Sequence, residues 1–206
     1  MDTATGPGVV PGDIAIEDLA AFHGHLCPSL ALGFRIAQWA LRILQCPRPH
    51  TDELLVIAEG VDSALDAIQF VAGCTVGKRT LIIVDQGKRA YTFYDRRDDS
   101  GVRIAVRYTG LADTPRLGEL RELMESGTAS FAQRQEYFTR AQARLDFILS
   151  APEDDFLSAG PAQHPIPALG PRDGWGQCAI CHEPTMQSRL VLKRSTLMCC
   201  DCAARH

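Results

Sequence analysis

The chain has 206 residues, of which 46% are hydrophobic and 22% charged, and its formal net charge at pH 7 is −4. This length and composition fit one substantial globular core with a small appended module, and the acidic balance argues against a surface built as a whole to bind nucleic acid or anionic lipid. The sequence contains no run of roughly 20 apolar residues and no signal-peptide core near the N-terminus. We therefore expect a cytoplasmic protein with no membrane partner.

The first half of the chain predicts both helices and strands. Residues 1–12 hold three glycines and two prolines and are expected to form a flexible tail. An apolar helical repeat then runs from Ser29, the expected N-cap, to Leu44. The turn residues 98–101 predict a hairpin between the two strands that flank them. The other elements expected, in chain order, are a helix at 13–22, a strand at 54–58, a helix at 63–71, and strands at 80–84, 89–94 and 102–108.

The second half becomes helical, with helices expected at 117–124 and 129–149. A helix-rich segment after a strand-rich one indicates the α+β class, with a mixed sheet and packed helices in a core domain at 13–150. Residues 151–174 contain five prolines and predict a linker to a separate module at 175–206.

Two histidines and a cysteine stand within five residues, at His23, His25 and Cys27, directly ahead of the apolar helix. A single histidine or cysteine is most often a packing residue, but imidazole and thiolate together are ligands of zinc and other transition metals. Because zinc takes four ligands, or three and an open position at a catalytic site, Cys74 is the candidate for the fourth ligand. The sequence thus predicts a core metal site, which is closed with four ligands and open to water or substrate with three.

The same residues allow a metal-free alternative. Cys27, near the start of a helix, would then work with Cys74 as a redox or sulfur-transfer pair. Two neighbouring histidines are more typical of a metal site than of a redox dithiol, so metal binding is the preferred interpretation. Asp66, Gln69 and Lys78 are further candidates, either to orient the ligands or to bind an anionic substrate, against the alternative that they are solvated surface residues.

Four cysteines near the C-terminus form two Cys-x2-Cys pairs separated by 17 residues: Cys178, Cys181, Cys199 and Cys202. Each pair turns two sulfurs toward one ion, so the spacing predicts a structural zinc in a small zinc-ribbon or treble-clef-like module. A module of this size cannot hold a core of its own, and metal binding should supply much of its folding free energy. The charge of a four-thiolate zinc site, about −2, cancels the slight basic excess of the module, which favours a regulator that contacts protein over one that binds nucleic acid.

Several segments resemble, in order and spacing, the FmdE family, which takes its name from a component of formylmethanofuran dehydrogenase. The segments are FHGHLCPSLALG (22–33), DAIQ (66–69), GCTVGK (73–78), DQGK (85–88) and YTFY (91–94). The terminal zinc knuckle is an appendage that many family members carry, so the resemblance covers most of the chain.

This resemblance implies an α+β core, often a homodimer with exchanged elements, that holds a metal in a cleft lined by the first and third segments. It also implies an accessory role toward a molybdenum or tungsten enzyme, such as a formylmethanofuran or formate dehydrogenase, as a partner. A reaction does not follow from the resemblance, because the same fold supports many functions.

Overall fold

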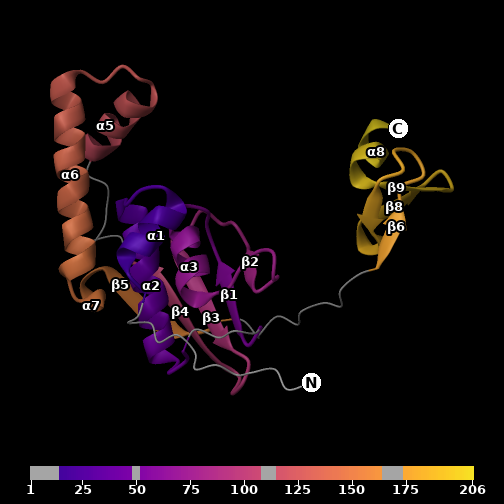
Figure 1. Cartoon of the computed structure of the whole chain (residues 1–206), viewed down its shortest axis with the longest axis horizontal. Coiled ribbons are helices and arrows are strands. Elements are labelled where there is room, and N and C mark those ends of the chain that lie inside the picture. Colours follow the sequence, from indigo (N-terminus) through magenta and orange to yellow (C-terminus); the bar gives the residue numbers. More distant parts are fainter. Residues whose placement is uncertain (1–13, 48–51, 108–114, 164–173) are drawn as a thin grey trace. The chain divides into compact units, whose positions relative to one another are not determined.

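The computed structural model describes residues 14–47, 52–107, 115–163 and 174–206. They belong to two compact units, a core domain up to residue 166 and a C-terminal module from residue 167 (Figure 1). The tail expected at residues 1–12 lies outside the described residues.

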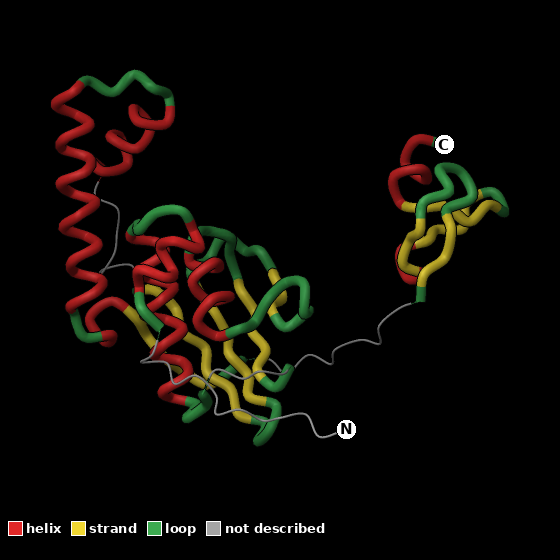
Figure 2. The backbone as a smooth tube through the Cα atoms, in the orientation of Figure 1, coloured by secondary structure: helices red, strands yellow, loops and turns green. Residues whose placement is uncertain are grey.

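The core domain has the expected α+β architecture, with helices α1, α2 and α3 on one face of a mixed sheet (Figure 2). Among the described residues, no helix combines the length and the apolar character needed to cross a membrane. The elements of the core domain are α1 (Ile16–His23), α2 (Pro28–Ile43), β1 (Leu54–Ala58), α3 (Ala64–Ala72), β2 (Leu81–Ile83), β3 (Ala90–Asp95), β4 (Ser100–Val106), α5 (Pro115–Glu125), α6 (Phe131–Ser150), α7 (Glu153–Phe156) and β5 (Leu157–Pro161).

The five strands of the core domain have the order β2-β1-β3-β4-β5. Strands β1 and β2 are parallel and α3 connects them, whereas all other neighbours are antiparallel. Strands β3 and β4 form the expected hairpin, with Asp95 opposite Ser100. Its turn therefore comprises residues 96–99 and begins two residues before the predicted turn at 98–101.

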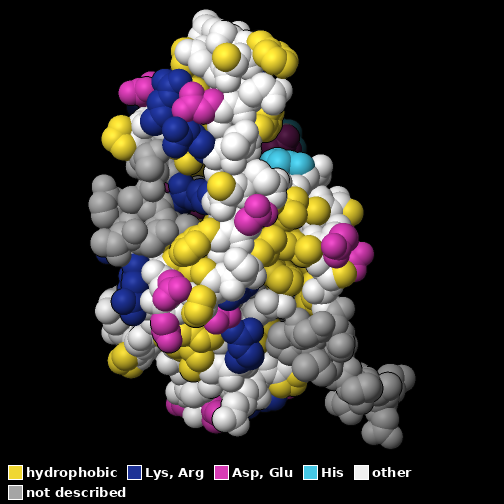
Figure 3. Space-filling view, turned by 90° about the vertical axis from the view of Figure 1, so that its left-hand side faces the viewer, with side chains coloured by type: hydrophobic (Ala, Val, Ile, Leu, Met, Phe, Trp, Pro, Cys, Tyr) yellow, Lys and Arg dark blue, Asp and Glu magenta, His cyan; other side chains and the backbone are white. Residues whose placement is uncertain are grey.

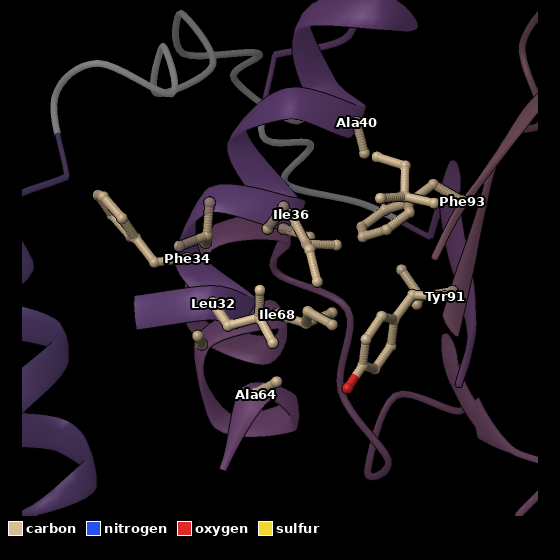
Figure 4. Close-up of a cluster of buried hydrophobic side chains, with 14 of the residues drawn as sticks. Leu32, Phe34, Ile36, Ala40, Ala64, Ile68, Tyr91 and Phe93 are labelled. Carbon is tan, nitrogen blue, oxygen red and sulfur yellow. The ribbon is translucent and has the colours of Figure 1, made fainter. Parts of the chain in front are cut away.

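Helix α2 contributes much of the hydrophobic core, as its apolar repeat predicts. Figure 4 shows Leu32 and Ile36 of α2 close to Ile68 of α3, with Tyr91 and Phe93 of β3 on the sheet side. All five side chains are buried. Burial of each such side chain stabilises the fold by about 1.5–3 kcal/mol, so this cluster holds the helical layer on the sheet.

Helices α2 and α3 approach each other very closely at Gly33. A Cβ atom at Gly33 would lie 2.4 Å from the backbone oxygen and 2.6 Å from the Cα of Ala64, the first residue of α3. Any side chain there would force the two helices apart, because backbone atoms cannot swing away as the end of a side chain does.

The 20-residue helix α6 begins with a capping box, in which Ser130 Oγ accepts a hydrogen bond from the Gln133 N–H and the Gln133 side chain accepts one from the Ser130 N–H. At its other end, the Arg35 guanidinium of α2 donates to the carbonyl oxygens of Ile148 (2.7 Å) and Ala151 (2.8 Å). These carbonyls have no partner within the helix, so Arg35 satisfies them and ties α6 to α2.

The first part of the segment predicted as a linker belongs to the core domain. Residues Glu153–Phe156 form α7, and Leu157–Pro161 form the edge strand β5, which pairs with β4. Phe156 and Leu157 are buried in the core, and Pro161 is tolerated because it stands on an edge strand. Residues 164–173, the later part of the expected linker, lie outside the described residues.

The C-terminal module consists of two small hairpins and a short helix. Its elements are β6 (Trp175–Gln177), β7 (Pro184–Met186), a 3₁₀ turn (Gln187–Arg189), β8 (Leu190–Lys193), β9 (Thr196–Cys199) and α8 (Cys200–Arg205). Among the module's described residues, 174–206, the buried cluster consists of Cys178, Met198 and Cys202, with Cys199 and Ala203 packed against them. Such a small cluster agrees with a module whose stability depends on a metal.

The close approach at Gly33 gives a testable prediction. Gly33→Ala should destabilise the core domain by about 1–3 kcal/mol, because the new methyl group overlaps the backbone of Ala64. Gly118→Ala, on α5, is the matched control: the added Cβ meets no atom within 4 Å, and alanine favours the helix by about 0.5–1 kcal/mol. Guanidinium unfolding of both variants measures the difference, and an equal effect of the two substitutions would contradict the packing described here.

Candidate metal centres

Three potential metal ligands converge in the core domain: His23, His25 and Cys27. Their ligand atoms all lie within 4.8 Å of one another, and the two imidazole ring centroids are 4.9 Å apart. A tetrahedral zinc ion with bonds of about 2.0–2.3 Å separates its ligand atoms by about 3.3–3.8 Å. Small adjustments of these side chains therefore suffice for them to hold one ion.

The backbone between α1 and α2 explains why the three residues converge. His23 ends α1, and Gly24 follows as the C-cap with φ = 101°, a left-handed conformation that glycine adopts without strain. The Gly24 N–H donates to the Ala20 carbonyl at 2.8 Å and closes the helix. The chain thus leaves the helix directly after His23, which lets the His25 ring lie beside the His23 ring.

Asp66 of α3 orients the His23 ring. Its Oδ2 lies 2.7 Å from His23 Nδ1, and because an ionised carboxylate only accepts hydrogen bonds, we assign the proton to Nδ1. The other ring nitrogen, Nε2, is buried and has no hydrogen-bond partner among the described residues. Metal-binding histidines usually have this arrangement, in which one ring nitrogen donates to a carboxylate and the other nitrogen binds the metal.

Cys27 is the N-cap of α2, a role that the sequence predicted for Ser29. Its Sγ accepts a hydrogen bond from the Leu30 N–H at 3.4 Å. The helix begins two residues earlier than expected because Pro28, whose φ is fixed near the helical value and which has no N–H to satisfy, occupies its first position. This start places the Cys27 sulfur, rather than the Ser29 hydroxyl, at the end of the helix.

The structure does not bring Cys74, the expected fourth ligand, into this group. Cys74 follows the C-cap Gly73 of α3 and is buried, and its thiol donates to the Leu54 carbonyl at 3.2 Å. Burial raises the pKa of the Cys74 thiol to about 12, despite the opposing effect of Lys78. The thiol is therefore protonated at neutral pH and belongs to the hydrophobic core.

Of the other candidates, Asp66 contacts the group through its hydrogen bond to His23. Lys78 Nζ donates to the Gly73 carbonyl at 3.0 Å and lies 3.6 Å from an Asp52 carboxylate oxygen, so it supports the loop after α3. Gln69 is half-buried on α3, one turn after Asp66. The motif around Cys74 therefore shapes the structure next to the group rather than supplying a ligand to it.

A cavity of about 440 Å³ adjoins the group at Cys27, which is within the size range of small-molecule sites. Its wall comes from the first turns of α2, the residues before α3 and β3, and one face each of α5 and α6. The lining residues are Cys27, Pro28, Ser29, Leu32, Asp62, Ser63, Arg89, Leu117, Arg121, Glu125, Tyr137, Ala141, Arg144 and Ile148. Sequence analysis missed this cavity, although Arg144 stands in the same helical stripe as Tyr137, Ala141 and Ile148.

The C-terminal module brings its four cysteines together, with their sulfur atoms within 4.8 Å of one another: Cys178, Cys181, Cys199 and Cys202. Burial alone would raise the pKa of the Cys178 thiol, but backbone N–H groups, including that of Cys199 at 3.2 Å, lower it to about 6. These hydrogen bonds stabilise the thiolate form of Cys178, which is the form that binds a metal.

The structure also distinguishes the two adjacent cysteines of the second pair. Cys199 is the N-cap of α8, and its Sγ accepts from the Cys202 N–H at 3.4 Å. Cys200 is exposed, and its Sγ donates to the Arg189 carbonyl at 3.3 Å. Cys199 thus belongs to the four-sulfur group and Cys200 lies outside it, as the Cys-x2-Cys spacing predicts.

Comparison with protein families gives a match over residues 22–158 to the family described as "FmdE, Molybdenum formylmethanofuran dehydrogenase operon". The chain belongs to the FmdE family. The matched region includes the His23–His25–Cys27 group, Asp66 and the whole sheet of the FmdE core except the last residues of β5. The expected family and the α+β fold are therefore confirmed.

A curated relative from Archaeoglobus fulgidus, named "Probable S-adenosyl-L-methionine-binding protein", is 29% identical over 196 residues. The match covers 90% of this chain but 51% of the relative, so the chain spans about half the length of that protein. A solved structure, that of a tungsten formylmethanofuran dehydrogenase FmdE-like protein from Syntrophus aciditrophicus, superimposes with a TM-score of 0.63 and 19% identity. The match covers 97% of this chain and 98% of that one, and this likeness concerns the fold.

The thiol environments predict a reactivity pattern. With excess zinc present at pH 8, iodoacetamide should modify exposed Cys200 readily and Cys74 on the order of a thousandfold more slowly, because burial raises the Cys74 pKa to about 12. Cys46, whose pKa burial likewise raises to about 12, serves as the internal control. Peptide mass spectrometry measures the rates, and equal labelling of Cys74 and Cys200 would show that Cys74 is a reactive thiol.

Proposed function

We propose that the FmdE core of this chain binds one transition metal ion through His23, His25 and Cys27, and that zinc is the preferred metal. The observation that carries this proposal is the His23 ring, with Asp66 on Nδ1 at 2.7 Å and a buried Nε2 that has no partner among the described residues. A buried nitrogen without a partner is costly, and a metal at this position removes that cost. The mixed nitrogen and sulfur donors suit zinc and related metals better than magnesium or calcium.

The number of ligands favours an open site over a closed one. With Cys74 held in the core, three protein ligands remain, which is the number found at catalytic zinc sites. A metal held in this way supplies a Lewis acid with a free coordination position. The chain's own contribution is to orient His23 through Asp66, to present the Cys27 sulfur at the end of α2, and to place a cavity beside that sulfur.

The thiol-based alternative receives less support. A redox or sulfur-transfer pair needs two accessible thiols of which one ionises readily, whereas Cys74 is buried and its pKa is raised to about 12 by that burial. Its hydrogen bond to the Leu54 carbonyl also holds the proton on the sulfur.

For the C-terminal module we propose a structural zinc bound by Cys178, Cys181, Cys199 and Cys202. The four sulfurs fill a tetrahedral site and leave no open position. Because its buried cluster is so small, the module depends on the ion to fold. In the folded module, the surface can contact a protein partner.

The biological setting that we propose is an accessory role toward a molybdenum or tungsten dehydrogenase system. This part of the proposal is supported by the description of the family and by the name of the similar structure. The name of the curated relative suggests S-adenosylmethionine as another ligand to test.

Metal stoichiometry tests the proposal directly. The purified chain should contain two zinc ions by elemental mass spectrometry, and Cys27→Ala and Cys178→Ala should each remove one, because each breaks a different site. Cys200→Ala, outside the four-sulfur group, should retain both. A chain that holds one zinc, insensitive to Cys27→Ala, would contradict the core site and leave the C-terminal site intact.

Asp66→Ala should weaken zinc binding at the core site about 10–100-fold, since the His23 ring loses the carboxylate that orients it. Competition with a fluorescent chelator measures the affinity. Asp18→Ala removes an exposed carboxylate from α1 and should leave the affinity unchanged. If both variants bind zinc as the wild type does, Asp66 has no part in the site.

A further inference from the structure

The wall of the cavity beside Cys27 contains a buried hydroxyl oxygen whose hydrogen bonds are not satisfied. Ser29 is the second residue of α2 and lines the cavity two residues after Cys27. Its Oγ atom is buried and has no hydrogen-bond partner among the described residues. A hydroxyl group is both a donor and an acceptor, and leaving it buried without a partner is costly. The packing of α2 alone therefore does not explain this serine.

The neighbouring metal group has the same property. His23 Nε2 is also a buried atom without a hydrogen-bond partner in the described part of the chain, and a metal ion is the partner proposed for it above. The two atoms belong to residues six positions apart, one in the metal group and one in the wall of the cavity that adjoins this group at Cys27. Native structures leave few buried polar groups unpaired, so two of them around one cavity point to a binding site.

The charged side chains of the wall, in contrast, already have partners. Arg89 Nε lies 3.3 Å from a carboxylate oxygen of Asp62, and Asp62 also accepts a hydrogen bond from the Tyr91 hydroxyl. Arg121 and Arg144 likewise make interactions within the protein. The wall therefore does not require an ionic ligand to balance its arginines.

The α5–α6 hairpin, which forms one side of the cavity, is balanced in charge. Residues 115–150 contain five arginines, no lysine and five acidic residues, so their formal net charge is zero. On the hairpin surface, Arg116 pairs with Glu136 and Glu119, and Arg140 pairs with Glu136. Figure 3 shows basic and acidic side chains side by side on the hairpin. A neutral ligand matches this balance better than an ion does.

Much of the remaining wall is apolar and comes from three helices. Leu32 lies one turn after Ser29 on α2, Leu117 belongs to α5, and Ile148 belongs to α6. All three aliphatic side chains are buried in the free protein. A ligand with a short carbon chain can place that chain against them while its polar group meets the start of α2.

The start of α2 suits the oxygen of a carbonyl group. The N-terminus of this 16-residue helix carries a partial positive charge of about half a unit. The Ser29 hydroxyl can donate one hydrogen bond, and a metal ion held by Cys27 would supply a Lewis acid. All three favour an oxygen with a partial negative charge, and an amide or ester provides such an oxygen on an uncharged molecule.

We propose that this cavity binds a small neutral carbonyl compound, an aliphatic amide or ester. The Ser29 hydroxyl donates a hydrogen bond to the carbonyl oxygen, and the carbon chain packs against Leu32, Leu117 and Ile148. The proposal deepens the proposed function and rests on it only for the metal, which would polarise the same carbonyl group. Ser29 is then the residue that distinguishes a carbonyl compound from other apolar molecules.

Pentanamide tests the class of the ligand. Titration of the zinc-loaded full chain, followed by protein NMR shifts, should show binding of pentanamide and at least about fivefold weaker binding of 1-pentanol, which has no carbonyl group. Pentanoate should also bind more weakly than pentanamide, because its charge gains no unpaired cation in the wall. Equal binding of 1-pentanol would overturn the choice of a carbonyl compound, and tighter binding of pentanoate would overturn the choice of a neutral one.

Ser29→Ala should weaken pentanamide binding about fivefold or more at unchanged zinc content, because the hydrogen bond to the carbonyl oxygen is lost. Without ligand, the same variant should have an unchanged or higher midpoint of guanidinium unfolding, since it removes a buried hydroxyl that has no partner in the described structure. Ser150→Ala is the matched control. Its hydroxyl donates to the Asp146 carbonyl at the end of α6, outside the cavity wall, so this variant should bind pentanamide normally and gain no stability.

The combination of weaker binding and retained or increased stability distinguishes a ligand-binding serine from a structural one. A lower unfolding midpoint of Ser29→Ala, or unchanged binding of pentanamide, would overturn the role of Ser29. A zinc-loaded chain that binds none of the three probes would overturn the carbonyl site and leave the metal site intact. Ser29-dependent binding of pentanamide to a chain that retains no zinc at the core site would support the carbonyl site while the proposed metal site fails.

Discussion

The contact between Gly33 and Ala64 determines how the helices on the sheet are arranged. With 2.4 Å between a Gly33 Cβ and the Ala64 oxygen, α2 and α3 lie closer than any side chain would allow. This approach sets the first turn of α3 beside the start of α2, and Asp66, two residues after Ala64, then reaches His23 at the end of α1. The candidate metal centre is therefore a consequence of helix packing as much as of the His-Gly-His-x-Cys segment.

The second determinant is the attachment of α6 to α2. Arg35 binds the carbonyls at the C-terminal end of α6, and its guanidinium also lies 5.6 Å from the centre of the Phe156 ring and 3.1 Å from a Glu153 carboxylate oxygen. Because these contacts fix the position of α6 along α2, they fix where Arg144 stands relative to Cys27. A scaffold whose rigid elements each contribute one side chain is well suited to hold a ligand between them.

The sequence predicted those elements that are specified by residues close together in the chain. The apolar repeat of α2, the strand at Leu54–Ala58 and the two Cys-x2-Cys pairs depend on neighbouring residues, and the structure contains each of them. The convergence of His23, His25 and Cys27 was also predictable, because five residues of chain cannot separate them far.

Other features depend on contacts between distant segments and could not be predicted from neighbouring residues in the sequence. Cys74 was predicted to be a ligand because of its residue type, but its direction is set by the Leu54 carbonyl of β1. The proline-rich stretch after residue 151 suggested a linker. Residues Leu157–Pro161 instead form a strand because they pair with the edge of β4, and the local sequence does not indicate this pairing. Arg144 in the apolar stripe of α6 was the one local signal of the cavity, and its meaning depended on the partner helices.

Binding of zinc by two imidazoles and one thiolate of the core domain can be tested directly. Zinc X-ray absorption on the full chain with Cys199→Ser and Cys202→Ser, loaded with one equivalent of zinc, reports on this site without the signal of the C-terminal one. We expect one sulfur at about 2.3 Å and nitrogen or oxygen ligands at about 2.0–2.1 Å. Two or more sulfurs around the ion, or no zinc retained by the folded core, would contradict the proposed core site.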